Sequence, residues 1–268
     1  MNKVVGFIGC GNMGGAMMGG LIKSKLVTPE NIIVGDLNEK RLEQVKKQFG
    51  INVTTDNTEV ARKADILVLS VKPNIYKIVI DGIKDEVKED VVIITIAAGK
   101  GISETEELFG AKLKVIKVMP NTPALVGEGM AAICPNKKVS QEELNEAVSM
   151  FESFGKAEVL DEKYMDAVTA VSGSSPAYVF MFIEAMADAA VLEGIPRNKA
   201  YKMAAQAVLG SAKMVLETGK HPGELKDMVC SPAGTTIAAV AKMEEKGFRT
   251  AVIEGMRACA EKSREMSK

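Results

Sequence analysis

The chain of 268 residues contains little of what several kinds of binding site require. It has one histidine and no tryptophan, and aromatic residues make up only 4% of the sequence, which argues against a surface that stacks nucleic-acid bases. Lys and Arg together number 34 and Asp and Glu 35. The resulting net charge of −1 creates no global positive field, so we expect neither nucleic acid nor a membrane as a partner.

The four cysteines, Cys10, Cys134, Cys230 and Cys259, stand far apart in the chain. No pair has the spacing of a metal motif, and a single histidine cannot build a histidine-based zinc site, so we expect no metal. Free thiols are typical of a reducing compartment, which favours a cytoplasmic location. The apolar start of the chain breaks at Gly9 without a cleavage motif, and no uninterrupted apolar run reaches the ~18 residues of a membrane span.

Short runs of β-branched residues alternate with amphipathic stretches over the first part of the chain. This rhythm predicts a parallel sheet covered by helices on both faces. We expect strands at residues 4–8, 31–35, 66–70, 91–96, 114–118, 130–134 and 157–160, and helices at residues 39–49 and 141–154. Ser140, followed three residues later by Glu143, forms a capping box for the last of these helices.

From about Tyr164 the composition changes, because Ala, Met, Leu and Glu replace the β-branched runs. We expect helices at residues 176–193, 198–217, 235–246 and 249–266. The chain therefore divides into an expected α/β domain, residues 1–163, and an all-helical domain, residues 164–268. The helix at 176–193 is apolar almost all round, which predicts that it packs against a partner subunit as well as its own domain.

A glycine-rich turn, Gly9-Cys10-Gly11-Asn12-Met13-Gly14, follows the first expected strand. Gly9 permits a tight turn, Gly11 lets the backbone approach a pyrophosphate, and Gly14 lets the next helix pack close to the strand. The N-terminus of that helix directs N–H groups toward phosphates. Asp36 stands at the end of the second strand. Its separation from Gly14 is close to the ~20 residues at which a ribose-binding acid is expected. The pattern predicts a Rossmann-type domain with a dinucleotide site.

The glycine-rich motif does not decide between NADH and NADPH as the cofactor. The carboxylate of Asp36 accepts hydrogen bonds from a 2′-hydroxyl but repels a 2′-phosphate, which favours NADH slightly. Lys40 and Arg41 follow closely and could hold the 2′-phosphate of NADPH if Asp36 turns away. They could equally be solvated side chains in the first turn of a helix.

Two further stretches follow strands whose carboxyl ends are expected to face the cofactor. Ser70 ends the strand at 66–70 and Lys72 follows it closely. Lys72 is therefore better placed for a cofactor contact than an average surface lysine, although solvation alone also explains it. Ala98 lies in a run of small residues after the strand at 91–96. Such a run lets a ring or a ribose approach the backbone, unless it is only a turn.

Three polar stretches are candidates for a substrate site: residues 117–129, 172–178 and 229–237. The first is a loop stiffened by Pro120 and Pro123 after a strand. The third is a loop that enters a helix, where small residues expose several N–H groups that can hold a carboxylate. An ordinary helix N-cap explains the third stretch by itself.

Taken together, these motifs resemble the pyrroline-5-carboxylate reductase family over nearly the whole chain. The most specific part of the resemblance is the stretch from His221 to Thr236. The resemblance implies a Rossmann domain followed by a helical dimerisation domain. It also implies hydride transfer from NADPH or NADH to 1-pyrroline-5-carboxylate, giving L-proline in the last step of proline biosynthesis. Homodimers formed through the helical domain would assemble further in some members.

Carried over by position, the resemblance implies cofactor contacts in the loop at residues 9–14 and at Asn57, Lys72 and Ala98, and substrate contacts at Thr235 and Thr236. It places the hydroxyl of Thr236, the expected catalytic residue, near the ring nitrogen. Ser175 and Ala233 stand where the family usually has glycine. With the residues argued above, the expected cofactor site comprises Ile8, Gly9, Cys10, Gly11, Asn12, Met13, Gly14, Asp36, Asn57, Ser70, Lys72 and Ala98, and the expected substrate site Ser231, Gly234, Thr235 and Thr236.

Other interpretations of these residues are less favoured. His221 is better explained as a helix cap than as a general base, and Glu184 with Asp188 as a solvated or salt-bridged pair than as a catalytic one. Oxidation or alkylation of Cys10 could block the cofactor. A β-hydroxyacid dehydrogenase would need a catalytic lysine on the helix at 176–193, which has none. A non-catalytic dinucleotide sensor with the same fold would need no carboxylate cradle.

Overall fold

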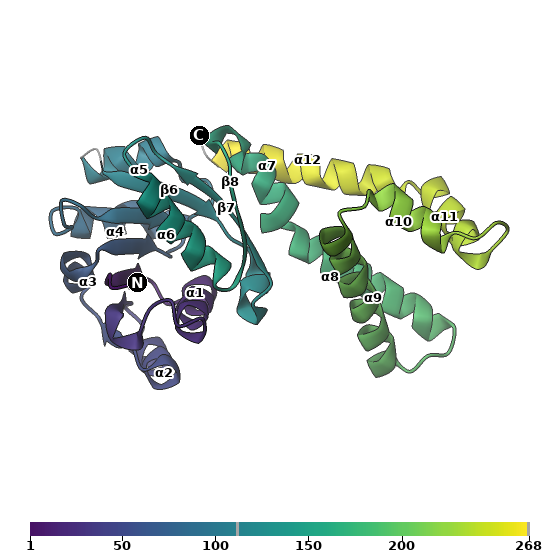
Figure 1. Cartoon of the computed structure of the whole chain (residues 1–268), viewed down its shortest axis with the longest axis horizontal. Coiled ribbons are helices and arrows are strands. Elements are labelled where there is room, and N and C mark those ends of the chain that lie inside the picture. Colours follow the sequence, from purple (N-terminus) through teal and green to yellow (C-terminus); the bar gives the residue numbers. More distant parts are fainter. Residues whose placement is uncertain (111–112, 267–268) are drawn as a thin grey trace. The chain divides into compact units, whose positions relative to one another are not determined.

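The structure is a computed structural model that describes residues 1–110 and 113–266. The chain divides into two compact units (Figure 1). The first comprises Met1–Ser174 together with the C-terminal segment that begins at Cys259, and the second comprises Ser175–Ala258. The change of composition near Tyr164 thus lies inside the first unit, which also takes in the end of the last helix.

An eight-stranded sheet forms the centre of the first unit, with the strand order β3-β2-β1-β4-β5-β6-β7-β8 among the described residues. Neighbouring strands are parallel except β6 and β7, which are antiparallel, so the mostly parallel Rossmann-type sheet is confirmed. The strand order reverses beside β1, which places a crevice at the carboxyl ends of β1 and β4. The strands are β1 (Val5–Ile8), β2 (Ile32–Gly35), β3 (Asn52–Thr54), β4 (Ile66–Leu69), β5 (Val92–Thr95), β6 (Lys114–Met119), β7 (Gly129–Pro135) and β8 (Gly155–Val159).

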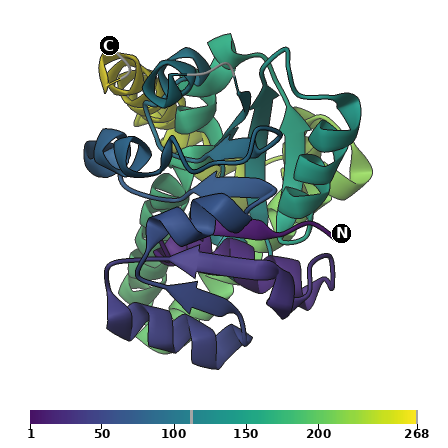
Figure 2. The ribbon, with the colours of Figure 1, turned by 90° about the vertical axis from the view of Figure 1, so that its left-hand side faces the viewer.

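Helices cover both faces of this sheet (Figure 2). One face packs against α1 (Asn12–Lys23), α2 (Glu39–Phe49) and α6 (Gln141–Glu152), and the other against α3 (Asn57–Lys63), α4 (Tyr76–Ile83) and α5 (Ile102–Phe109). Helix α6 begins with the expected capping box between Ser140 and Glu143. Short turns complete the unit: η1 (Pro29–Asn31), η2 (Pro73–Ile75), η3 (Thr122–Val126), η4 (Glu162–Tyr164), α7 (Met165–Val168) and the π-helical η5 (Thr169–Gly173).

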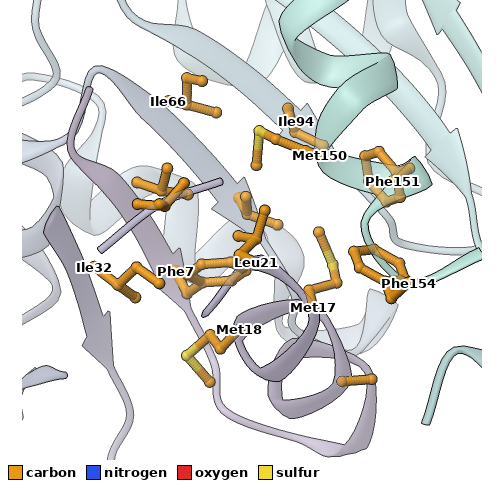
Figure 3. Close-up of a cluster of buried hydrophobic side chains, with 14 of the residues drawn as sticks. Phe7, Met17, Met18, Leu21, Ile32, Ile66, Ile94, Met150, Phe151 and Phe154 are labelled. Carbon is orange, nitrogen blue, oxygen red and sulfur yellow. The ribbon is translucent and has the colours of Figure 1, made fainter. Parts of the chain in front are cut away.

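Two apolar cores form because successive strand residues point to opposite faces of the sheet. In β5, Ile94 packs on the side of α1 and α6, whereas Ile93 packs on the side of α4 and α5. Figure 3 shows the first core, in which the side chains of α1 meet those of the strands and of α6. These cores hold the carboxyl ends of the strands in fixed positions. The labelled members are Phe7, Met17, Met18, Leu21, Ile32, Ile66, Ile94, Met150, Phe151 and Phe154.

Strand β3 was not predicted from the sequence. Strand β3 has three residues, lies at the edge of the sheet and is partly exposed. Asn52 and Thr54 flank a single valine, so no apolar run marks the strand. Pairing with β2, rather than intrinsic preference, makes this segment extended.

The second unit contains α8 (Ser175–Leu192), α9 (Arg197–Thr218), α10 (Pro222–Val229), α11 (Thr235–Glu245) and the first part of α12 (Phe248–Met266). Helix α8 packs against α9, and the ring of Phe182 lies 5.9 Å from that of Phe248. Of the described residues in this unit, only Ala187, Ala200 and Ala204 are buried.

The apolar side chains of α8 are therefore unusually exposed. Phe180 is 63% and Met181 69% exposed. By length and composition the helical stretch Glu162–Leu192 would be able to cross a membrane, and almost none of it is buried. Exposed apolar surface of this extent requires additional cover.

Candidate active site

The glycine loop after β1 has the backbone geometry that the fingerprint requires. Gly9 adopts a φ of +98°, and a Cβ atom there would lie 2.7 Å from the carbonyl oxygen of Ser70. A Cβ atom on Gly14 would lie 2.7 Å from the carbonyl oxygen of Gly9. By contrast, nothing lies within 4 Å of a Cβ atom built on Gly11. Gly9 and Gly14 are thus needed by the fold, whereas Gly11 leaves open space in which a ligand can approach the backbone.

A crevice of about 380 Å³ lies at this edge of the sheet. Helix α1 begins here, and its N-cap residue Gly11 offers no side chain to its first N–H groups, so these remain suited to an anion. Of the expected cofactor residues, Gly11, Asn12, Met13, Ser70, Lys72 and Ala98 line the crevice. The lining also includes Arg41, Val71, Pro73, Ile96, Ala97, Met119 and Pro120. Ile96 and Ala97 follow the end of β5, and that position is the sequence signal that would have found them, whereas Arg41 lies in α2.

A larger, open groove of about 890 Å³ runs along α1, α2 and η3. It shares Gly11 and Arg41 with the crevice but contains neither Ser70 nor Lys72. Only the smaller crevice adjoins the carboxyl ends of β4 and β5, the edge at which such sheets bind their ligands.

Asp36 is turned toward the glycine loop. Its Oδ2 accepts hydrogen bonds from the N–H of Cys10 at 2.9 Å and from the Cys10 thiol at 3.2 Å, and its Oδ1 accepts one from the N–H of Asn38 at 2.9 Å. Partial burial opposes ionisation, but the N–H groups of Cys10 and Asn38 outweigh it and lower the pKa of the Asp36 carboxyl. The carboxylate is therefore charged and held in one orientation beside the loop.

The same contact makes Cys10 a poor nucleophile. Burial, followed by the hydrogen bond to Asp36 and its negative charge, raises the pKa of the Cys10 thiol to about 12. The side chain is only 4% exposed. Modification of Cys10, which could block the cofactor, is therefore expected to be slow in the folded protein, because a reactive cysteine needs an accessible thiolate.

We expect iodoacetamide at pH 8 to leave Cys10 unmodified in the native protein while the half-buried Cys230 and Cys259 react. Cys134 should also be protected, because burial and then the charge of Glu162 raise the pKa of its thiol. Peptide mapping by mass spectrometry measures each site, and labelling in denaturant should modify all four cysteines. Rapid native labelling of Cys10 would contradict the geometry.

Three of the expected cofactor residues have different environments. The hydroxyl of Ser70 donates to the carbonyl oxygen of Gly9 at 2.6 Å and so holds the glycine loop. Lys72 is exposed at the start of η2. The Oδ1 atom of Asn57 is buried without a hydrogen-bond partner among the described residues. An orphaned buried acceptor, an open glycine backbone and a free helix N-terminus together fit a dinucleotide, which supplies both hydroxyl donors and phosphates.

The expected substrate residues belong to the second unit, in the turn between α10 and α11. Gly234 is the N-cap of α11 and offers no side chain to the first N–H groups of that helix. A Cβ atom on Gly234 would lie 2.3 Å from Oγ of Ser231, so a larger residue there would displace the Ser231 hydroxyl. Ser231 and Thr235 are exposed and Thr236 is half-buried. The turn therefore presents hydroxyl groups beside unoccupied helix N–H groups, an arrangement suited to a small carboxylate.

Ala233 carries a backbone strain in this turn. Its φ is +57°, in the left-handed region that favours glycine. We expect Ala233→Gly to raise the free energy of unfolding by about 1 kcal/mol, because the left-handed conformation costs a residue with a Cβ atom roughly that much. Denaturant titration measures the change. Ala241→Gly, within α11, is the matched control and should lower stability by about 1 kcal/mol. Equal losses in both variants would show that residue 233 is not strained.

Two alternative catalytic candidates have structural roles. Nδ1 of His221 accepts a hydrogen bond from the N–H of Gly223 at 3.1 Å, so His221 caps α10 as expected. Asp188 is exposed and forms an ion pair with Arg197. Glu184 is exposed. The structure gives no metal-binding group of three or more His, Cys, Asp or Glu residues in the described part of the chain.

Comparison with known proteins supports the division into two functional parts. Residues 4–99 match a family described as NADP oxidoreductase coenzyme F420-dependent, and residues 162–266 match one described as pyrroline-5-carboxylate reductase dimerisation. The chain thus has the plan of an NAD(P)H-dependent oxidoreductase with a nucleotide-binding domain and a helical dimerisation domain.

Whole-chain relatives define the family. The chain is 54% identical to pyrroline-5-carboxylate reductase of Escherichia coli (strain K12), over all 268 residues and the whole of that protein. It is 47% identical to the enzyme of that name from Methanosarcina acetivorans, covering 100% of this chain and 99% of the other. The chain belongs to the pyrroline-5-carboxylate reductase family.

Solved structures support the same family assignment. A pyrroline-5-carboxylate reductase from Coxiella burnetii matches with a TM-score of 0.94 and 32% identity, covering both chains fully. A Plasmodium falciparum pyrroline carboxylate reductase with NADP bound matches with a TM-score of 0.90 and 35% identity, covering 100% of this chain and 99% of that one.

Proposed function

We propose that this protein reduces 1-pyrroline-5-carboxylate to L-proline with NADPH or NADH, the last step of proline biosynthesis. The observation that carries the proposal is that one chain has both a crevice beside Gly11 and, at Gly234, a helix N-terminus without a side-chain cap. Full-length similarity to reductases of that name supports the same substrate. A cyclic imine that carries one carboxylate matches the hydroxyl groups and the helix N–H groups of the turn.

The first unit binds and orients the cofactor, which supplies the hydride when it is bound. The N–H groups at the start of α1 hold the pyrophosphate, and Gly11 lets it approach. The Asp36 carboxylate faces the glycine loop, where the adenosine ribose is expected. Ala98 and the crevice lining beyond β5 leave room for the nicotinamide end.

The second unit provides the substrate contacts. The N–H groups around Gly234 and Thr235 hold the carboxylate, and the hydroxyl of Thr236 orients the ring nitrogen by hydrogen bonding. Residues 231–236 include neither a histidine nor an acid that would serve as a proton donor. The substrate therefore enters as the protonated iminium or takes its proton from water, and protonation makes its carbon a better hydride acceptor.

The helical unit is proposed to form a homodimer. Its exposed apolar side chains, such as Phe180 and Met181 on α8, need cover, and the family match over residues 162–266 is to a dimerisation domain. A second copy of this surface supplies that cover, which explains the apolar helix without a membrane. The dimer can assemble further. A cytoplasmic location is proposed as well, because the free cysteines suit a reducing compartment.

The decisive assay follows cofactor oxidation at 340 nm with 1-pyrroline-5-carboxylate, with piperideine carboxylate and acyclic keto acids as comparison substrates. We expect turnover with the five-membered ring and none with the keto acids. Failure to oxidise cofactor with any cyclic imine, in a protein that binds NADH or NADPH, would favour a dinucleotide sensor. Light scattering of the same sample measures the assembly.

A further inference from the structure

The loop at residues 97–101 joins β5 to α5 and borders the cofactor crevice through Ala97 and Ala98. Its position therefore affects the shape of the crevice. The loop is held on its inner side by a short chain of hydroxyl groups. Oγ1 of Thr105 donates to the carbonyl oxygen of Gly101 at 2.7 Å, and the hydroxyl of Tyr76 lies 3.0 Å from the same Oγ1. Because Thr105 gives its proton to a carbonyl, its oxygen accepts the proton of Tyr76.

A second contact comes from the start of the segment that leads to the helical unit. The N–H of Ile102, the first residue of α5, donates to Oε1 of Glu162 at 2.8 Å. The N-cap residue of α5 is Gly101, which has no side chain to satisfy this group. A Cβ atom on Gly101 would lie 3.3 Å from the same carboxylate oxygen. Glu162 thus caps α5 from a distant part of the chain, and its charge also suits the positive end of that helix.

A third contact comes from the last turn of α12. Gly99 has a φ of +73°, and a Cβ atom there would lie 3.2 Å from the carbonyl oxygen of Met266. The same turn is bonded to α7, because Oγ of Ser263 donates to Oδ1 of Asp166 at 2.6 Å. Ser263 is buried. Helix α12 therefore ends against the loop and is fixed there.

These contacts share a topological feature. The chain passes between its two units twice, after Ser174 and after Ala258. On the side of the first unit, the two connecting segments are residues 162–174 and 259–266. They are bonded to each other through Asp166 and Ser263, and each touches the loop, one through Glu162 and the other through Met266.

We propose that Glu162, together with the last turn of α12, is a positioning residue for cofactor binding. It holds the loop at residues 97–101 in the conformation that the crevice requires. Both connections to the helical unit thereby anchor one wall of the cofactor site. The inference rests on the proposed use of NAD(P)H in this crevice, but not on the identity of the imine substrate.

The test is a titration of the full-length protein with NADH and with NADPH, followed by cofactor fluorescence and without any imine. We expect Glu162→Ala to raise the Kd for the tighter cofactor about fivefold, because only part of the free energy of the lost hydrogen bond is transmitted to the loop that borders the crevice. Glu162→Gln should stay within about twofold of the wild type, because its amide oxygen can still accept from Ile102. In steady state the cofactor KM should rise while kcat and the imine KM stay unchanged.

Glu143→Ala is the matched control. Glu143 also accepts a backbone N–H at a helix start, that of Ser140 before α6, but it does not line the crevice. It should lower thermal stability and leave the cofactor Kd unchanged. Should Glu162→Ala fail to fold, Ser263→Ala provides the same measurement, with faster hydrogen exchange at the Ile102 amide as a second readout.

Two results would overturn the inference: an unchanged cofactor Kd in Glu162→Ala, or an equal rise in Glu143→Ala. Both results are compatible with a protein that still reduces 1-pyrroline-5-carboxylate, so they would reject the positioning role and leave the proposed function standing. Conversely, cofactor binding that depends on Glu162 in a protein without reductase activity would support the positioning role and reject the proposed function.

Discussion

Replacement of Asp36 by serine is expected to shift the cofactor preference toward NADPH by about 10- to 100-fold in the ratio of kcat/KM values. The wild-type carboxylate is ionised and fixed by the N–H groups of Cys10 and Asn38. A 2′-phosphate placed next to it would meet a like charge, and two charges about 4 Å apart repel by up to ~4 kcal/mol near a protein surface before salt screening. We therefore expect the wild type to prefer NADH.

The ratio of the kcat/KM values for the two cofactors is the informative quantity, because Asp36 also holds the glycine loop. Its loss should weaken binding of both cofactors, whereas only NADPH gains from removal of the charge. Asp90→Asn removes a charge from a side chain that is 95% exposed and does not line the crevice, and it should leave the ratio unchanged. Arg41→Ala should weaken NADPH selectively in the Asp36→Ser background. A wild-type enzyme with a large NADPH preference would refute the assignment of Asp36.

Replacement of Thr236 by alanine is expected to lower kcat by about 10- to 1000-fold, the range seen when one positioned polar contact to a reacting group is removed. The hydroxyl at this position is proposed to orient the ring nitrogen, and Thr236 is half-buried at the start of α11. Cofactor binding should remain nearly intact, because Thr236 does not line the crevice beside Gly11. Steady-state kinetics with 1-pyrroline-5-carboxylate and a separate cofactor titration measure the two effects.

Thr236→Ser keeps the hydroxyl and should recover most of the activity. Thr250→Ala, an exposed threonine on α12, removes the same atoms elsewhere in the helical unit and should behave like the wild type. Unchanged turnover in Thr236→Ala would show that its hydroxyl has no part in the reaction.

Much of the first unit could be read from local patterns. The strand at residues 5–8 and the glycine turn after it are marked by composition alone, as is the capping box at Ser140. Strand β3 could not be found in this way, since its extended shape depends on pairing with β2. Six of the twelve expected cofactor residues line the crevice, and the contacts of the set differ: Ser70 holds the glycine loop, whereas Asn57 has a buried acceptor.

The contacts made over long sequence separations were beyond any local pattern. Nothing near Glu162 signals that its carboxylate caps α5, and nothing near Met266 signals that it lies against Gly99. From the sequence, the thiol of Cys10 was expected to be open to modification, because it lies in a turn predicted to bind a ligand. Its environment, set by Asp36 and by burial, instead raises the pKa of the thiol to about 12.

By itself the sequence determined the class of fold, the family and the places where chemistry is concentrated. These follow from short-range features: side-chain periodicity, glycines at required spacings and motifs in a characteristic order. Only the tertiary structure decided which way Asp36 points, which cysteines are protected and which distant residues support the crevice. Those properties depend on burial and on hydrogen bonds between segments far apart in the chain, which no local pattern of residues encodes.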